Sequence, residues 1–304
     1  MIVFLVTGEH QHTLRALAQE PSLNIRIATY GELFASVHAA RATYVFCDLH
    51  RLPLWQLRQA SRVYRQLRDG GMRVLNDPSK WPTRWGLLRN LYRQGVNTFD
   101  AYRVEEGLIP VRWPVFLKSE GDDAGTISGL IHSWEDAQRA IDRAVQDGAT
   151  LAGLVLVEYA AEPVAPGIFR KLSEFRIGSS YFAGPTLHEG DWRVIHGSDA
   201  ITPAGFFEDD LRTVRENPHE AKMKAVFGLT GIEYGRAEFS MVGGSAQTYG
   251  INTNPGIAFP NSHRSEARME AFRVFKTKLF EALTKIDTPA LGAKSLSKIG
   301  SALT

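Results

Sequence analysis

The residues best suited to chemistry lie in a predicted β-hairpin over residues 234–251. Because side chains alternate along a strand, Arg236 and Glu238 lie on the same face of it. A polar stretch that begins with Asn252 follows at the strand end. A carboxylate and an asparagine oxygen are hard ligands that suit Mg²⁺, and a neighbouring arginine suits a negatively charged transition state. The alternative is a solvent-exposed hairpin in which the arginine and the glutamate pair with each other.

The turn of this hairpin is predicted at residues 243–245, which read Gly-Gly-Ser. A three-residue loop there pairs residue 242 with residue 246. Counting back along both strands, this register places Glu238 opposite Gly250.

A second candidate is the apolar strand that ends at Lys118 and the loop that follows it. The loop contains Gly121, Gly125 and Thr126. A lysine at a strand end, beside free backbone N–H groups of a glycine-containing loop, is able to bind a phosphate. Two aspartates in the same loop weaken the electrostatic case, and a surface loop with an ordinary lysine is the alternative.

Two further polar clusters follow. The apolar strand 154–159 carries Glu158 near its end, and Glu162 comes soon after, so the strand could cover an adenine and offer a carboxylate to a ribose. The alternative is a strand that simply leaves the core. Next, Lys171 and Arg176 belong to a basic segment that could meet phosphates or an acidic substrate, although a solvated edge strand is also consistent with it.

The elements that position these residues begin with an α/β pattern. Short apolar runs are predicted as strands at residues 2–6, 25–29, 44–47 and 72–75. Helices are predicted between them at 31–40 and 54–68. Strands that alternate with helices favour a parallel sheet covered on both faces.

After a proline-containing loop at 76–82, residues 83–94 are predicted to form a helix that Gly95 ends. A β-rich region follows. Its strands are predicted at 114–118, 154–159, 175–182 and 193–195, and its helices at 133–147, 209–227 and 265–285. The last fifteen or so residues resemble a mobile tail.

Composition narrows the class of function. The 304 residues carry 35 Lys and Arg against 33 Asp and Glu, a formal net charge of +2, whereas binding to nucleic-acid phosphates usually needs a more basic surface. An arginine stripe at residues 58, 62, 65 and 68 is more typical of a solvated helix face. The single cysteine, Cys47, excludes an intramolecular disulfide and CxxC motifs and is predicted to be buried. GxxxxGK[ST], GxGxxG, HExxH and GxSxG motifs are absent.

No segment of the sequence approaches the ~20 apolar residues of a membrane span. We therefore expect a soluble, cytoplasmic protein that binds neither membranes nor nucleic acid.

Taken in order, these segments resemble the ATP-grasp superfamily of carboxylate–amine ligases, which includes D-alanine–D-alanine ligase-like and glutamate ligase-like proteins. The resemblance covers residues 70–262, with a compatible α/β domain before them. In that family a basic residue eleven positions before a helix-ending glycine contacts ATP phosphate. Here that position is Arg84, before Gly95, where the family usually has lysine. Lys118 resembles the second nucleotide-binding lysine, and residues 121–126 resemble the phosphate-covering loop.

The resemblance implies the remaining roles. Residues implied to bind ATP are Arg84, Lys118, Gly121, Gly125, Thr126, Glu158, Tyr159, Ala160, Glu162 and Lys171. Catalytic roles are implied for Arg236, Lys118 and Arg176, of which Arg236 faces an acylphosphate. Mg²⁺ ligands are implied at Glu238 and Asn252.

The implied fold class is α/β, with an N-terminal parallel α/β domain followed by ATP-grasp α+β subdomains. The expected ranges are 1–78 for the first domain, 79–150 for the central subdomain, 151–288 for the C-terminal subdomain and 289–304 for the tail.

One position departs from the family pattern. The last metal strand of the family normally carries a glutamate two residues before its asparagine, and here Gly250 stands before Asn252. The other metal carboxylate, usually aspartate, is Glu238. The implied function is an ATP-dependent ligase that uses Mg-ATP to activate a small-molecule carboxylate as an acylphosphate and joins it to an amine. The alternative is a non-catalytic ATP-binding relative with a degraded metal site. Dimers occur in the family, so a homodimer is compatible with the sequence.

Overall fold

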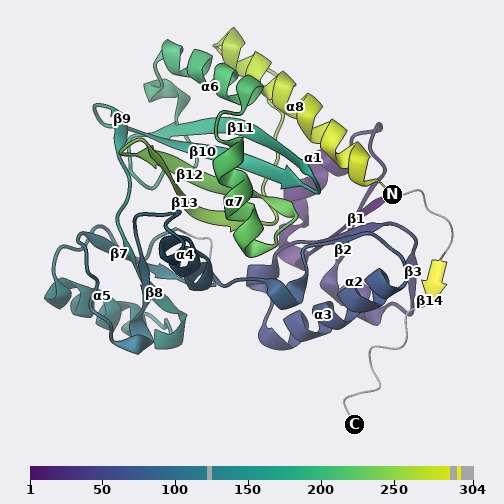
Figure 1. The fold of residues 1–304 in the computed structure, drawn as a ribbon, viewed down its shortest axis with the longest axis horizontal. Helices are drawn as coiled ribbons and strands as arrows, with labels where there is room; N and C mark the ends of the chain where they lie inside the picture. Colours follow the sequence, from purple (N-terminus) through teal and green to yellow (C-terminus); the bar gives the residue numbers. More distant parts are fainter. Residues whose placement is uncertain (122–124, 288–292, 296–304) are drawn as a thin grey trace.

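The computed structural model describes residues 1–121, 125–287 and 293–295 (Figure 1). A parallel sheet of order β2-β1-β4-β5 forms the N-terminal domain. Its strands are β1 (Ile2–Val6), β2 (Ile25–Thr29), β4 (Thr43–Phe46) and β5 (Val74–Leu75). The α-helices of this domain are α1 (Arg15–Ala18), α2 (Tyr30–Ala35) and α3 (Leu54–Asp69), with short 3-10 helices at Gly8–Leu14, Leu49–Arg51 and Pro78–Lys80. The predicted parallel α/β domain is confirmed.

Strand β1 is apolar throughout because both faces of its sheet are covered. Val3 and Leu5 pack in the cluster that α2 and α3 complete. Phe4 and Val6 point the other way, into a cluster shared with the long helix α8 (Glu266–Ile286). Cys47, just after β4, is fully buried in that second cluster, as predicted.

The helix predicted at 31–40 is wrong in its second half. Helix α2 ends at Ala35 because Ser36 adopts an extended conformation and its hydroxyl donates to the His38 carbonyl at 2.6 Å. Such local bonds compete with continuation of a helix. Strand β3 (His38–Ala40) follows, and β14 (Ala293–Ser295) pairs with it in antiparallel fashion. Those three residues are therefore a strand, and the rest of the tail predicted at 289–304 lies outside the described residues.

The central sheet is antiparallel, with order β6-β8-β7. Its strands are β6 (Ala101–Arg103), β7 (Val115–Ser119) and β8 (Leu154–Glu158), and α5 (Trp134–Gln146) packs on it. Short 3-10 helices lie at Val104–Glu106 and Leu151–Gly153. Although β8 follows the boundary predicted at residue 150, its pairing makes it a strand of this sheet.

A second antiparallel sheet, of order β11-β10-β12-β13 with β9 beside β10, forms the largest layer. Its strands are β9 (Pro163–Ala165), β10 (Ile168–Ile177), β11 (Ser180–Glu189), β12 (Tyr234–Val242) and β13 (Ser245–Asn252). The helices around it are α4 (Arg84–Arg93), α6 (Ala204–Glu216), α7 (Glu220–Thr230) and α8, with a 3-10 helix at Asp199–Ile201. Helix α7 lies across one face of the sheet, while α6 and α8 lie together on the other side (Figure 1).

Three predicted elements of this region differ from the structure. The strand predicted at 175–182 spans a turn at Gly178, which has a φ of 59° that favours glycine. The helix predicted at 209–227 is two helices, because Asn217 adopts a left-handed conformation and a proline follows it. Residues 193–195 form a loop and not a strand.

Helix α4 connects the two antiparallel sheets. Thr83 caps it, as its hydroxyl accepts from the Gly86 N–H at 3.2 Å, so the predicted helix start is confirmed. Leu87 and Leu91 pack on the larger sheet, whereas Leu88 packs on the central one. The N-terminus of α4 is thereby held at the junction of both sheets.

The predicted loop at 76–82 contains a buried connection between the N-terminal domain and β12. Asn76 Nδ2 donates to the carbonyls of Phe46 and Tyr234 at 3.0 and 2.8 Å. Its Oδ1 accepts from the N–H groups of Glu233 and Tyr234, both at 2.9 Å.

Within the described part of the chain, no helix is long and apolar enough to cross a membrane.

Candidate functional site

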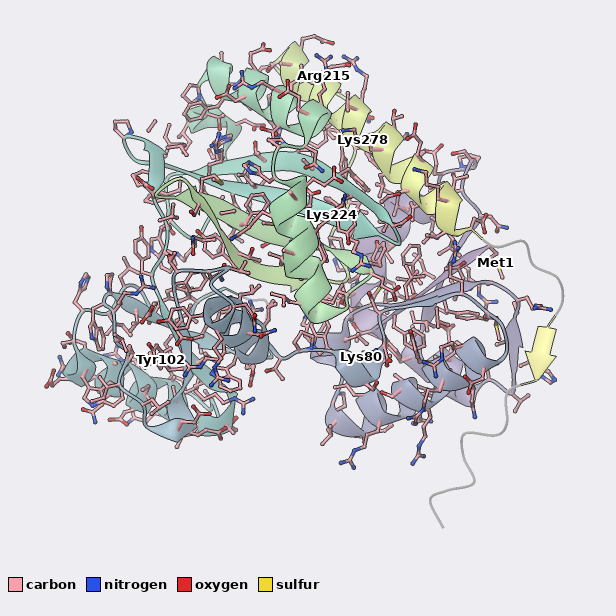
Figure 2. All side chains as sticks on the ribbon, in the orientation of Figure 1. Met1, Lys80, Tyr102, Arg215, Lys224 and Lys278 are labelled. Carbon is pink, nitrogen blue, oxygen red and sulfur yellow. The ribbon has the colours of Figure 1, made fainter. Side chains whose placement is uncertain are left out.

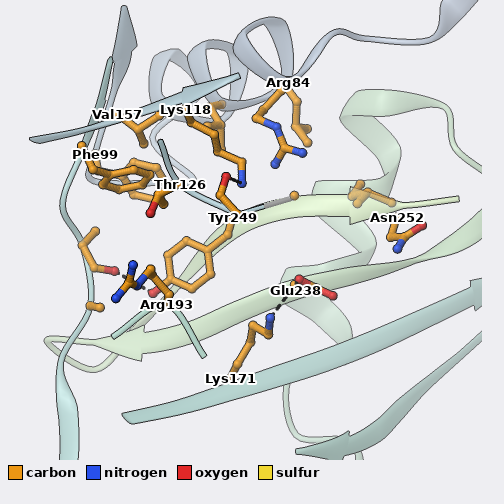
Figure 3. A pocket seen from close by; sticks show the side chains of 18 of the residues that line it. Arg84, Phe99, Lys118, Thr126, Val157, Lys171, Arg193, Glu238, Tyr249 and Asn252 are labelled. Atoms are coloured by element: carbon orange, nitrogen blue, oxygen red, sulfur yellow. Dashed lines mark hydrogen bonds and ion pairs between the residues drawn. The ribbon is translucent and has the colours of Figure 1, made fainter. Parts of the chain in front are cut away.

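A pocket of about 340 Å³ opens between the central sheet and the larger sheet, below the N-terminus of α4 (Figure 3). Its walls come from β7, β8, β10, β12, β13 and α4, together with the loop around Trp192. Of the residues predicted for the site, the pocket brings together Arg84, Lys118, Gly125, Thr126, Glu158, Tyr159, Ala160, Lys171, Arg236, Glu238 and Asn252. Segments more than a hundred residues apart in sequence thus converge on one cavity.

Three basic side chains lie toward one end of the pocket, whereas Arg193 lies over the Trp192 ring, 5.7 Å from its centroid. Arg84 and Lys118 enter from α4 and β7, and Lys171 enters from the large sheet (Figure 3). Lys118 Nζ donates to the Gly125 carbonyl at 2.8 Å, so the lysine also holds the loop that follows β7. Because Arg84 is the first residue of α4, its charge adds to the partial positive charge of the helix N-terminus. This end is suited to an anion.

Glu238 is held between two cations, Arg236 and Lys171. Arg236 donates to its Oε1, and Lys171 Nζ lies 3.3 Å from its Oε2. Burial acts to raise the pKa of Glu238, but the charges of Arg236 and Lys171 outweigh it and lower the pKa to about 2. Glu238 is therefore ionised and both of its oxygens have basic partners.

The predicted opposition of Glu238 and Gly250 is confirmed, although the predicted turn is not. The turn has two residues, since Val242 pairs with Ser245. A β-bulge then adds one residue to β13, so that Phe239 pairs with Thr248 and Glu238 with Gly250. The extra residue is Tyr249, and the two errors in the predicted register cancel.

The oxygen ligands predicted for Mg²⁺ lie close in register but do not form a suitable donor set. Arg236 pairs with Asn252, next to the pairing of Glu238 with Gly250. Asn252 Oδ1 accepts from the Asn254 N–H at 2.8 Å, and both Glu238 oxygens have basic partners. Among the described residues, no group of three or more His, Cys, Asp or Glu side chains could hold a metal ion. Mg²⁺ in nucleotide sites uses one or two carboxylates besides phosphates and waters, and the one predicted carboxylate here is already paired with Arg236 and Lys171.

The other end of the pocket is aromatic, and sequence reasoning missed most of it. Trp192 contacts Phe116 and Tyr159, with ring centroids 4.9 and 5.5 Å apart. Tyr249 donates its hydroxyl to the Ala160 carbonyl at 2.6 Å. The position of Trp192 depends on the path of a long loop, and that of Tyr249 on the bulge, so neither has a short-range sequence signal.

Two polar atoms in the pocket wall are buried without a hydrogen-bond partner among residues 1–121, 125–287 and 293–295. They are Arg236 Nε and Thr126 Oγ1. A buried donor that lacks a partner costs free energy, and both residues line the cavity.

The carboxylate of Glu158, which was predicted to contact a ribose, is hydrogen-bonded by groups of the central subdomain. It accepts from Tyr102 Oη at 2.9 Å and from Arg112 Nη2 at 2.8 Å. The Asp100 N–H donates to it at 3.0 Å. Tyr102 lies inside the central subdomain (Figure 2), and Glu158 is only 2% exposed. Burial next to an arginine and a tyrosine explains why this strand ends in an acid.

Three more predicted residues lie outside the pocket wall. Arg176 is on the opposite face of the large sheet, where Nε and Nη1 donate to the carbonyls of Gly178 and Ile232 at 3.1 and 2.8 Å. Glu162 is exposed and accepts from the Gly243 N–H at 2.8 Å, so it fixes the hairpin turn. Gly121 borders a separate hollow of about 560 Å³, whose other walls include Thr7 and Thr29 at the carboxyl ends of β1 and β2.

Comparison with known proteins connects this architecture to a known fold. No family model and no curated protein matches the sequence significantly. In structure, the chain is similar to a RimK domain protein ATP-grasp from Sphaerobacter thermophilus, with a TM-score of 0.52 and 15% identity over 96% of this chain and 99% of that one. It is also similar to D-alanine–D-alanine ligase from Bacillus anthracis complexed with ATP, with a TM-score of 0.52 and 13% identity over 94% and 96% of the two chains. The chain therefore has the ATP-grasp fold.

Proposed function

We propose that this protein binds ATP in the pocket and uses it to activate a small-molecule carboxylate and join it to an amine. The observation that carries the proposal is the division of the pocket into an aromatic end and a basic end. Trp192 and Tyr159 offer a surface for a flat base, while Arg84 and Lys118 offer positive charge to phosphates. A nucleoside triphosphate has the same division. The solved ATP complex of a ligase with this fold supports the same ligand.

The reaction requires two steps. The substrate carboxylate attacks the γ-phosphorus of ATP, so ADP leaves and an acylphosphate forms. The amine then attacks the acyl carbon, loses a proton and displaces inorganic phosphate, which leaves an amide bond.

Phosphoryl transfer depends mainly on alignment and on neutralisation of charge. Lys118 and Arg84 would bind the ATP phosphates. Arg236 would stabilise the acylphosphate and then the oxyanion that forms when the amine attacks. Arg236 Nε, which has no partner within the described ranges, is a donor available for that oxygen.

The test of this function is binding and turnover in the Lys118→Ala variant. We expect ATP affinity to fall by about 10- to 100-fold, as for loss of a charged hydrogen bond. Calorimetric titration measures affinity, and release of ADP from mixtures of carboxylates and amines measures turnover. Lys224→Ala is the matched control, because Lys224 lies on α7 and pairs with Glu220 at 2.5 Å, away from the pocket (Figure 2). Equal ATP affinity in both variants would contradict the proposed site.

A second candidate is a nucleotide-binding protein that does not turn ATP over. It is favoured by Gly250, which supplies no carboxylate opposite Glu238, and by the ion pairs that occupy Glu238. The two candidates differ in one measurement. The non-catalytic protein binds ATP but releases no ADP or phosphate with any carboxylate and amine that the ligase assay contains.

A further inference from the structure

We infer that the phosphate-bearing ligand of this pocket is bound without a divalent cation, and that the basic side chains of the pocket neutralise its charge instead. The inference rests on the proposed ATP site and concerns how that site holds phosphate. It depends on three features of the pocket wall: the partners of its carboxylates, the neighbour of Gly250, and the kind of atom that lacks a partner.

Each carboxylate that lines the pocket among the described residues already has donors around it. Glu158 is bound by Arg112 and Tyr102. Glu120 accepts from the Trp85 N–H at 3.3 Å and lies 3.6 Å from Arg103. Glu238 lies between Arg236 and Lys171, as described above. A divalent cation would have to displace two cations from Glu238 to reach its oxygens.

The second feature is the neighbour of Gly250. A Cβ atom added at Gly250 would lie 3.8 Å from Arg84 Nη1. Gly250 also stands opposite Glu238 in the hairpin. A guanidinium is therefore next to the position from which a second carboxylate would have completed a metal site. Repulsion from this charge opposes a divalent cation, whereas the same charge attracts phosphate oxygens.

The third feature is the kind of atom that lacks a partner in the described part of the pocket. Arg236 Nε is an N–H donor and Thr126 Oγ1 is a hydroxyl. Phosphate oxygens accept hydrogen bonds from both groups, but an arginine N–H has no lone pair to offer a metal ion. Together with Arg84, Lys118 and Lys171, these atoms form a set of donors for an anion.

The decisive experiment is calorimetric titration of the full-length protein with ATP, in excess EDTA and in excess MgCl₂. Because Mg²⁺ cancels part of the charge of ATP, we expect affinity in EDTA to equal or exceed affinity in Mg²⁺. Tightening by Mg²⁺ of more than about threefold, roughly half of the 1.4 kcal/mol that corresponds to a tenfold change, would overturn the inference and leave the proposed ATP site intact. Failure to bind ATP in either buffer would overturn both.

Glu238→Gln separates the two modes of binding by the sign of its effect. If Glu238 holds a metal ion, the substitution weakens binding of Mg-ATP. If its role is to pair with Arg236 and Lys171, the substitution frees these cations, and we expect ATP in EDTA to bind about 3- to 10-fold more tightly, in the range of one charged hydrogen bond. Glu106→Gln, at an exposed position, controls for the change in net charge. Weaker ATP binding by Glu238→Gln than by this control would overturn the inference.

Gly250→Glu tests the role of Arg84. The added carboxylate would meet Arg84, so we expect ATP affinity in EDTA to fall by about tenfold or more. Gly250→Ala is the matched control, since its Cβ makes only ordinary contact with Arg84, and its affinity should stay within about threefold of wild type. Thermal unfolding without nucleotide checks that each variant is folded. Unchanged ATP affinity in a folded Gly250→Glu variant would show that Arg84 does not contact the phosphates. That result would overturn the inference.

Discussion

Two glutamates, Glu174 and Glu238, lie on opposite faces of the large antiparallel sheet and differ in almost every property. Glu174 on β10 pairs with Ala237, and Glu238 on β12 pairs with Ser173, so they lie one register position apart on opposite faces. Glu174 is fully buried and accepts from Asn217 Nδ2 at 2.8 Å. Burial raises its pKa to about 8, against the lowering effect of that hydrogen bond. Glu238, by contrast, is 25% exposed, and two adjacent cations lower its pKa to about 2.

The contrast separates the packed surroundings of Glu174 from the cavity wall that carries Glu238. On the Glu174 side, the large sheet meets α7 through an apolar cluster. The side-chain amide of Asn217 donates to the Glu174 carboxyl there. Among the described residues that line the cavity beside Glu238, five are basic and three are acidic. An excess of partly buried cations is costly unless an anion balances it. The pocket face is therefore the face where substitutions should alter binding.

The strongest test of this contrast replaces one arginine on each face with leucine, in separate variants. Arg236→Leu removes a guanidinium from the pocket, and we expect ATP affinity to fall by about 30- to 100-fold, or about 2–3 kcal/mol. Arg176→Leu removes a guanidinium from the opposite face, where it donates to the carbonyls of Gly178 and Ile232. That variant should lose about 1–3 kcal/mol of stability in urea, while its ATP affinity is retained. Equal losses of affinity would break the distinction between the faces.

Glu174 provides a test through pH. Its carboxyl is protonated in the folded state up to about pH 8, whereas an unfolded glutamate ionises near pH 4.3, about its ordinary pKa. The contribution of this group to stability is therefore fully present below about pH 4 and is lost as pH rises toward 8. Glutamine cannot ionise. Between pH 5 and pH 8 we therefore expect the free energy of unfolding to fall less in Glu174→Gln than in the wild type, by at least about 1.4 kcal/mol, the equivalent of one pKa unit.

Urea unfolding at both pH values measures this difference. Glu106→Gln, which removes an exposed acid, should retain the pH dependence of the wild type. If Glu174→Gln retains it too, then Glu174 is not a neutral buried acid and the proposed contrast between the two glutamates is wrong.

Sequence patterns predicted those parts of the molecule that depend on local periodicity. The four-stranded parallel sheet and helix α4 agree with the structure. The family resemblance grouped Lys118 with Arg236 and Glu238, and these three residues line one pocket. These features can be predicted from sequence because strand alternation, helix-ending residues and the order of motifs each depend on short segments.

Sequence patterns did not predict features that depend on tertiary contacts. Glu158 and Arg176 were predicted to contact ligand, and their hydrogen-bond partners Tyr102, Arg112 and Ile232 come from distant segments. The sequence also does not indicate the bulge in β13, because tyrosine, the residue at position 249, is common in ordinary strands. The bulge has a chemical consequence, since it lets the Tyr249 hydroxyl donate to the Ala160 carbonyl.

That contact leads to the smallest effect we predict. Tyr249 donates to the Ala160 carbonyl, which lines the aromatic end of the pocket and would otherwise be open to the amino group of an adenine. Tyr249→Phe frees this carbonyl while the ring remains. We expect the preference for ATP over inosine triphosphate, which lacks that amino group, to rise by about 2- to 10-fold, the range of one neutral hydrogen bond. Competition between the two nucleotides measures the ratio of their affinities. An unchanged ratio would show that atoms other than the Ala160 carbonyl oxygen recognise the base.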